Sequence, residues 1–96
     1  MLTSYVSGLG AAAQAHERYA RTAMGQVRQR LTATQVAKGC GAKLDHMYQA
    51  FMHLGTAAAH VESMSGPNEY AMKALLQVLK RDVEIMWRSV RSECRL

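Results

Sequence analysis

Hydrophobic residues recur at alternating steps of four and three along two long segments, and this spacing narrows the available folds most strongly. The middle segment carries Ala33, Ala37, Cys40, Leu44, Met47, Phe51, Leu54, Ala58 and Val61. The last segment carries Met72, Leu76, Leu79, Val83, Met86 and Val90. Such heptads are typical of helices that pack side by side, and no segment alternates with the period of a strand. We therefore predict an all-α helical bundle.

The first third of the chain has a weaker apolar stripe. Its members are Tyr5, Leu9, Ala12, His16, Tyr19 and Ala23. In the same phase the stripe continues through Gln26 and Arg30, which are polar. Gly8, Gly10 and Gly25 each lower helix stability by about 1 kcal/mol relative to alanine. We therefore expect the first helix to begin near position 10 or 11.

Two segments are candidate turns. In segment 65–68, Gly66 can end a helix in the left-handed conformation, and Pro67 lacks the amide that a continuing helix needs. The other candidate is softer, since it rests on Thr32 and Gln35, which have the spacing of a capping box. The heptad phase runs through this second candidate without interruption.

Two architectures follow from these turns. The favoured one is an antiparallel bundle of three helices at about 10–31, 33–64 and 68–94, in a single domain that spans 1–96. The alternative is one long helix over 11–64 with a returning helix, in which the unpaired half packs against a second chain to form a dimeric bundle.

In both architectures the turn at Gly66 makes the last two helices antiparallel neighbours. Their heptad residues are then expected to form the core or a protein interface. These residues are Leu44, Met47, Phe51, Leu54, Leu76, Leu79, Val83, Met86 and Val90. Because large apolar side chains dominate the stability of a thin core, we expect Phe51→Ala to cost several kcal/mol.

Histidines recur every seven residues at His46, His53 and His60. Consecutive rings lie about 10.5 Å apart along a helix axis, whereas zinc ligands lie about 2 Å from the ion. No two of them can therefore bind one ion within a chain. They flank the stripe, which predicts a partly exposed row; a pH-sensitive interface and a metal ion shared between chains are alternatives. His16 lies in a stripe and is expected at a helix interface rather than as a metal ligand.

The chain has two cysteines and no CxxC motif, so free thiols and an intracellular, reducing compartment are expected, the cytoplasm first and an organelle matrix second. Cys40 is expected to be buried. Folding back at Gly66 brings Cys94 to the same level, which leaves a disulfide open as an alternative. No segment has the length and hydropathy of a membrane span.

The net charge of +5 leaves room for an anionic partner. A candidate patch on the last helix consists of Lys80, Arg81, Arg88, Arg91 and Arg95. Glu84 is spaced to pair with two of these cations, and a solvated face is the simpler interpretation. No glycine-rich phosphate loop and no pair of carboxylates is present, so no catalytic, metal-binding or cofactor-binding residue is predicted.

These observations predict a non-catalytic helical interaction module. It would be a structural or adaptor subunit that binds itself or a partner protein through its heptad faces. The alternative is a small basic nucleic-acid-binding or regulatory protein that uses the arginine row. Salt distinguishes the two, because phosphate-dominated binding weakens steeply as the salt concentration rises.

Overall fold

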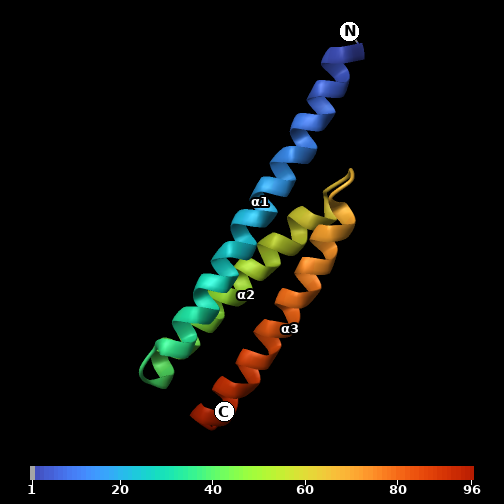
Figure 1. Cartoon of the computed structure of the whole chain (residues 1–96). Coiled ribbons are helices and arrows are strands. Elements are labelled where there is room, and N and C mark those ends of the chain that lie inside the picture. Colours follow the sequence, from blue (N-terminus) through green and yellow to red (C-terminus); the bar gives the residue numbers. More distant parts are fainter. Residues whose placement is uncertain (1) are drawn as a thin grey trace.

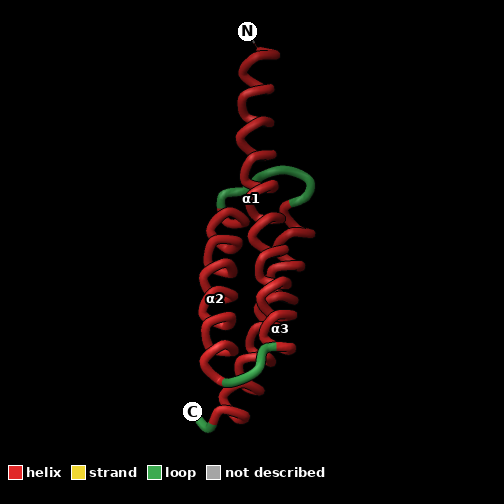
Figure 2. The backbone as a smooth tube through the Cα atoms, turned by 90° about the vertical axis from the view of Figure 1, so that its left-hand side faces the viewer, coloured by secondary structure: helices red, strands yellow, loops and turns green. Residues whose placement is uncertain are grey.

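The computed structural model describes the backbone of residues 2–96 and the side chains of residues 14–96. It contains three helices, α1 (Leu2–Val36), α2 (Cys40–Glu62) and α3 (Glu69–Cys94), and no strand among the described residues. The helices run alternately up and down and pack along their lengths (Figures 1 and 2). The prediction of an all-α bundle of three helices is therefore confirmed.

The first turn lies at residues 37–39, later in the chain than Thr32, where the capping box placed it. Gly39 has a φ of 91°, a conformation that favours glycine and that stops the helix sharply. Thr34 lies inside α1 and is buried. Its hydroxyl donates to the carbonyl oxygen of Arg30 at 2.7 Å, so the buried polar group has a hydrogen-bond partner. The predicted start of the second helix is wrong by several residues, and the single helix over 11–64 is excluded.

The second turn occupies residues 63–68, as the sequence predicts. Gly66 has a φ of 115°, in the region that favours glycine. Beyond the turn, Glu69 lies in the first turn of α3, where a negative charge complements the helix dipole. The bounds of α3 agree closely with the predicted range of 68–94.

The helix α1 begins at Leu2, so the expectation of a start near position 10 or 11 is wrong. A cost of about 1 kcal/mol for each glycine does not stop a helix that propagates from a packed segment. With 35 residues against the 23 of α2, α1 extends well beyond the loop that joins α2 to α3 (Figures 1 and 2). The N-terminal segment of α1 therefore projects from the bundle (Figures 1 and 2).

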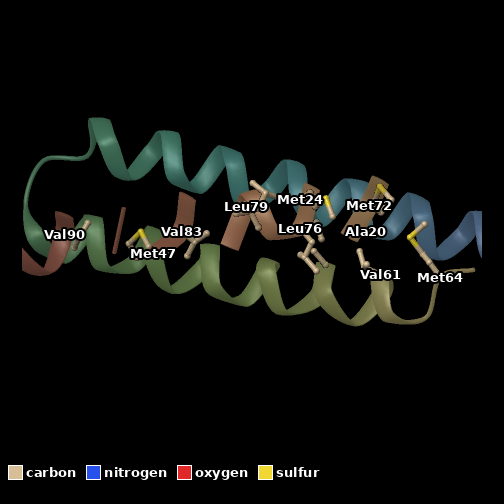
Figure 3. Close-up of a cluster of buried hydrophobic side chains, with 13 residues drawn as sticks. Ala20, Met24, Met47, Val61, Met64, Met72, Leu76, Leu79, Val83 and Val90 are labelled. Atoms are coloured by element: carbon tan, nitrogen blue, oxygen red, sulfur yellow. The ribbon is translucent and has the colours of Figure 1, made fainter. Parts of the chain in front are cut away.

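The core lies between the three helices (Figure 3). Its buried residues are Ala20, Ala23, Met24, Val27, Met47, Ala50, Ala57, Val61, Met64, Met72, Leu76, Leu79, Val83 and Val90. Of the predicted heptad residues, five are buried. Leu44, Leu54 and Met86 are partly buried and pack against the core. The heptad stripes of α2 and α3 are thus used mainly within one chain.

Phe51 departs from this pattern, since its side chain is 42% exposed. Its ring meets Trp87 edge-on at a centroid distance of 6.0 Å. From Met47 the buried stripe of α2 takes a step of three to Ala50, where the prediction took a step of four. Alanine at this position and at Ala57 lets the helices approach closely. Placing Phe51 in the core is wrong, and its replacement by alanine should cost less than expected.

The stripe predicted for α1 is only partly correct. Ala23 is buried and His16 is half-buried, whereas Tyr19 is 58% exposed. The buried face of α1 instead carries Ala20, Met24 and Val27. The side chains of Tyr5, Leu9 and Ala12 lie outside the described residues.

Candidate protein-interaction site

An open groove runs between α1 and α3. It has a volume of about 430 Å³. Its lining residues are Arg28, Leu31, Thr32 and Gln35 from α1, and Asp82, Ile85 and Met86 from α3. These positions are three or four residues apart within each helix, so each set lies on one helix face. The groove is therefore a strip bounded by two helix faces.

The chemistry of this groove is apolar at its floor and polar at its rim. Leu31 and Met86 are half-buried and pack against the core. Ile85 also lines the groove, and its side chain is 58% exposed. Arg28 and Asp82 supply one positive and one negative charge at the rim. This combination suits an amphipathic helix, which presents apolar residues to the floor and polar residues to the edges.

The groove continues toward the C-terminal end of α3. A second hollow of about 430 Å³ shares Gln35, Ile85 and Met86 with the first. Lys43 lines its far end, where its ammonium group lies 3.7 Å from the carboxylate of Glu93. The same ammonium group donates to the carbonyl oxygen of Thr34 at 3.0 Å. A single side chain of α2 thereby connects all three helices at this end.

The two cysteines lie at the same end of the bundle. Cys40 and Cys94 form a disulfide with a Cα–Cα distance of 5.7 Å and a sequence separation of 54 residues. Cys40 is exposed rather than buried, so the expectation of a buried thiol is wrong. The disulfide that the folding-back argument left open is the form adopted. The case for a reducing compartment rested on free thiols and loses that premise.

The histidine row is partly exposed, as predicted, since His46, His53 and His60 are all half-buried. The Nδ1 atom of His46 lies 3.1 Å from a guanidinium nitrogen of Arg30. His16 lies at the interface between α1 and α2, also as predicted, and its Nδ1 atom is 3.1 Å from Nδ1 of His60. Sequence spacing missed this last contact, because the pairing depends on where the first turn falls.

Glu17 forms a polar cluster at the opposite end of the bundle from the disulfide. Its Oε1 atom accepts hydrogen bonds from Arg21 at 2.8 Å and from the amide of Asn68 at 2.9 Å. The hydrogen bond from Arg21 is the main cause that lowers the pKa of Glu17, and Asn68 contributes in the same direction. The contact with Asn68 joins α1 to the loop between α2 and α3.

The residues of the predicted basic patch on α3 are all exposed. The patch consists of Lys80, Arg81, Arg88, Arg91 and Arg95. Within the described residues, the ion pairs join Arg21 to Glu17, Lys43 to Glu93 and Lys73 to Glu69. The predicted pairing of Glu84 with this patch is therefore not formed, and the patch is a solvated row of cations.

No protein-family model matches the chain, and neither a curated protein nor a solved structure matches it. In the part of the chain that the structure describes, no three histidine, cysteine, aspartate or glutamate side chains gather as metal ligands would. None of the described helices has the length and apolar character needed to cross a membrane. The most developed site is thus the groove between α1 and α3.

Proposed function

We propose that the protein is a non-catalytic helical interaction module that self-associates, with a helix of a second copy lying in the groove between α1 and α3. The observation that carries this proposal is the exposure of Ile85 in a groove that the half-buried side chains of Leu31 and Met86 also line. Covering an exposed isoleucine side chain stabilises the complex by about 25 cal/mol for each Å² of apolar surface that is buried.

The three-helix arrangement supports the choice of a helix as the ligand. Four-helix bundles bury a core between two pairs of helices, and here one side of the α1–α3 pair is open. A fourth helix in the groove would cover Ile85 and place its polar face beside Arg28 and Asp82. This is the geometry of recognition in which an amphipathic helix lies in a hydrophobic groove.

The projecting part of α1 is the segment best suited to fill the groove of a second copy. Residues 2–13 are helical, and Tyr5, Leu9 and Ala12 are spaced as one apolar stripe. Twelve helical residues span about 18 Å. In a symmetric dimer each chain would insert this segment into the groove of the other, so both grooves would be filled at once.

Replacing Ile85 by glutamate tests this proposal. The charge would be buried beneath the inserted helix, so Ile85→Glu should convert a dimer into a monomer. Tyr70→Glu is the matched control, because Tyr70 lies on the same helix outside the groove lining and is 85% exposed. Light scattering gives the mass, and circular dichroism checks the fold. A dimeric Ile85→Glu variant would contradict the assignment of the groove.

An alternative function is binding of nucleic acid by the basic patch on α3, and it is supported by the exposure of all five cations. A nucleic acid bound there would lose affinity steeply with salt. Titration of a fluorescent single-stranded oligonucleotide with wild type and with Arg88→Ala checks this alternative. Binding that is lost in Arg88→Ala and at high salt would favour the nucleic-acid function over self-association as the main role.

Two features of the chain point to different cellular compartments for the protein. Low cysteine content favoured an intracellular, reducing compartment, whereas an exposed disulfide persists best where conditions are oxidising. We propose that the protein works in the disulfide form shared by Cys40 and Cys94. Alkylation of thiols at the moment of cell lysis, followed by mass determination, measures the fraction that is oxidised. A fully alkylated chain would contradict this proposal.

A further inference from the structure

His16 and His60 form a pair that does not line the groove between α1 and α3 and takes no part in the proposed self-association. The two rings come from α1 and α2 and face each other, with an Nδ1–Nδ1 distance of 3.1 Å and a centroid distance of 5.4 Å. Both side chains are half-buried, so solvent reaches them. We propose that these two imidazoles form a binding site for a divalent transition-metal ion such as Zn²⁺.

The distance between the two nitrogen atoms supports this site. Zinc binds imidazole nitrogen at about 2.0–2.1 Å with tetrahedral angles, which places two nitrogen ligands about 3.3 Å apart. The observed 3.1 Å is close to this value. Rotation of the two rings about their side-chain bonds would direct both lone pairs toward one ion.

The surrounding packing fixes the two backbones at this separation. Ala20 lies one turn from His16 on α1, and Ala57 lies one turn from His60 on α2; both alanines are fully buried. Close approach of the helices over these small side chains sets the distance between the rings. A site whose ligands are held by two packed helices requires little reorganisation when the ion binds.

The proton balance of binding is simple. A hydrogen bond between the two Nδ1 atoms requires one ring to donate its Nδ1–H and the other ring to accept with an unprotonated Nδ1. Binding requires both Nδ1 atoms as ligands, so the donor ring changes to the tautomer that carries its proton on Nε2. Two neutral rings then bind the ion without net release of a proton, and the hydrogen bond is replaced by two coordinate bonds.

The remaining coordination positions belong to water. No third histidine, cysteine, aspartate or glutamate completes a cluster within the described residues. The nearest aromatic neighbour is Tyr19, whose ring centroid lies 5.1 Å from that of His60. Glu17 already accepts hydrogen bonds from Arg21 and Asn68. The site is therefore open, and it suits exchangeable binding rather than a structural zinc that the fold requires.

Zinc titration of the full-length chain tests the site. Isothermal calorimetry should give one ion per chain for wild type, and His60→Gln or His16→Gln should weaken binding at least tenfold. His53→Gln is the matched control, because it removes a half-buried histidine two turns away on the same helix and should bind zinc like wild type. Circular dichroism confirms that each variant is folded.

Thermal unfolding gives a second readout that depends on the native pair. An ion that binds only the folded chain multiplies the folding equilibrium constant by about elevenfold when its concentration is ten times the dissociation constant. This gain should be present in wild type and His53→Gln and absent in His60→Gln. Equal zinc affinity in wild type and His60→Gln, or a chain mass that doubles only when zinc is present, would overturn the proposal.

Discussion

The two ends of the bundle are held together by different chemistry. At the end where α3 terminates, the Cys40–Cys94 disulfide fastens α2 to α3, and Lys43 contacts both α1 and α3. At the other end, the loop at 63–68 meets α1 through the hydrogen bond between Asn68 and Glu17. A covalent bond between side chains joins two helices at the first end, whereas the side-chain contact of α1 with the loop at the second end is an exposed polar one, which contributes little in water.

The proposed functional features are distributed unequally between the two ends. The hydrogen-bonded end carries the projecting segment of α1, the His16–His60 pair and the polar cluster around Glu17 (Figure 1). The proposed metal site and the segment proposed to enter a second copy therefore both lie at this end, together with Glu17, whose pKa is lowered. The disulfide end carries the Cys40–Cys94 bond and Lys43, and the groove proposed to accept a second copy extends toward it.

The largest difference is expected from two methionines at opposite ends of the core (Figure 3). Met47 is 1% exposed within α2 near the disulfide end, and Met64 is 6% exposed in the loop after α2. Met47→Ala leaves a cavity between packed helices and should cost about 2–5 kcal/mol. Met64→Ala should cost less, because the loop can close over the space. Urea unfolding measures both, and equal losses would contradict the contrast between the ends.

Loss of the disulfide is the next largest effect. Replacing Cys40 and Cys94 together by alanine frees a loop with a sequence separation of 54 residues and should lower stability by roughly 2–4 kcal/mol. Thermal unfolding with and without reductant gives the same quantity in the wild-type chain. The double variant should be insensitive to reductant. A wild-type midpoint that does not change on reduction would show that the covalent bond does not secure this end.

The smallest effect concerns acid. Arg21 and Asn68 hold the pKa of Glu17 below its ordinary value of 4.5. A lowered pKa means that the carboxylate stabilises the fold above pH 4.5, and that this stabilisation is lost as the pH falls through the folded-state pKa. Glu17→Gln should therefore flatten the acid limb of the stability curve. Urea midpoints measured across this pH range check the prediction; an unchanged acid limb would contradict it.

The sequence predicts α3 and its turn well because the signals there are unambiguous. The heptad of α3 consists of large side chains such as Leu76 and Leu79. In the turn before it, Gly66 and Pro67 prevent a continuous helix. The first turn was misplaced because a capping box at Thr32 competes with Gly39. The helix continues through Thr32, and the chain turns just before Gly39, where a φ of 91° favours glycine.

The candidate sites were less predictable for a related reason. Whether Phe51 or Ala50 faces the core depends on a single step of three or four along α2, and both steps preserve the heptad phase. The contact between His16 and His60 depends on the register of α1 against α2, which the position of Gly39 sets. Contacts between two helices can therefore be predicted from the sequence only when the turn that joins them is placed to within one residue.

Sedimentation equilibrium of the full-length chain and of a chain that lacks residues 2–13 tests the central claim most directly. We predict twice the single-chain mass of 10.6 kDa for the full-length protein, and the mass of a folded monomer for the shortened chain. A full-length chain that stays monomeric at all concentrations, or a shortened chain that still dimerises, would contradict the claim that the projecting segment of α1 fills the groove of a second copy.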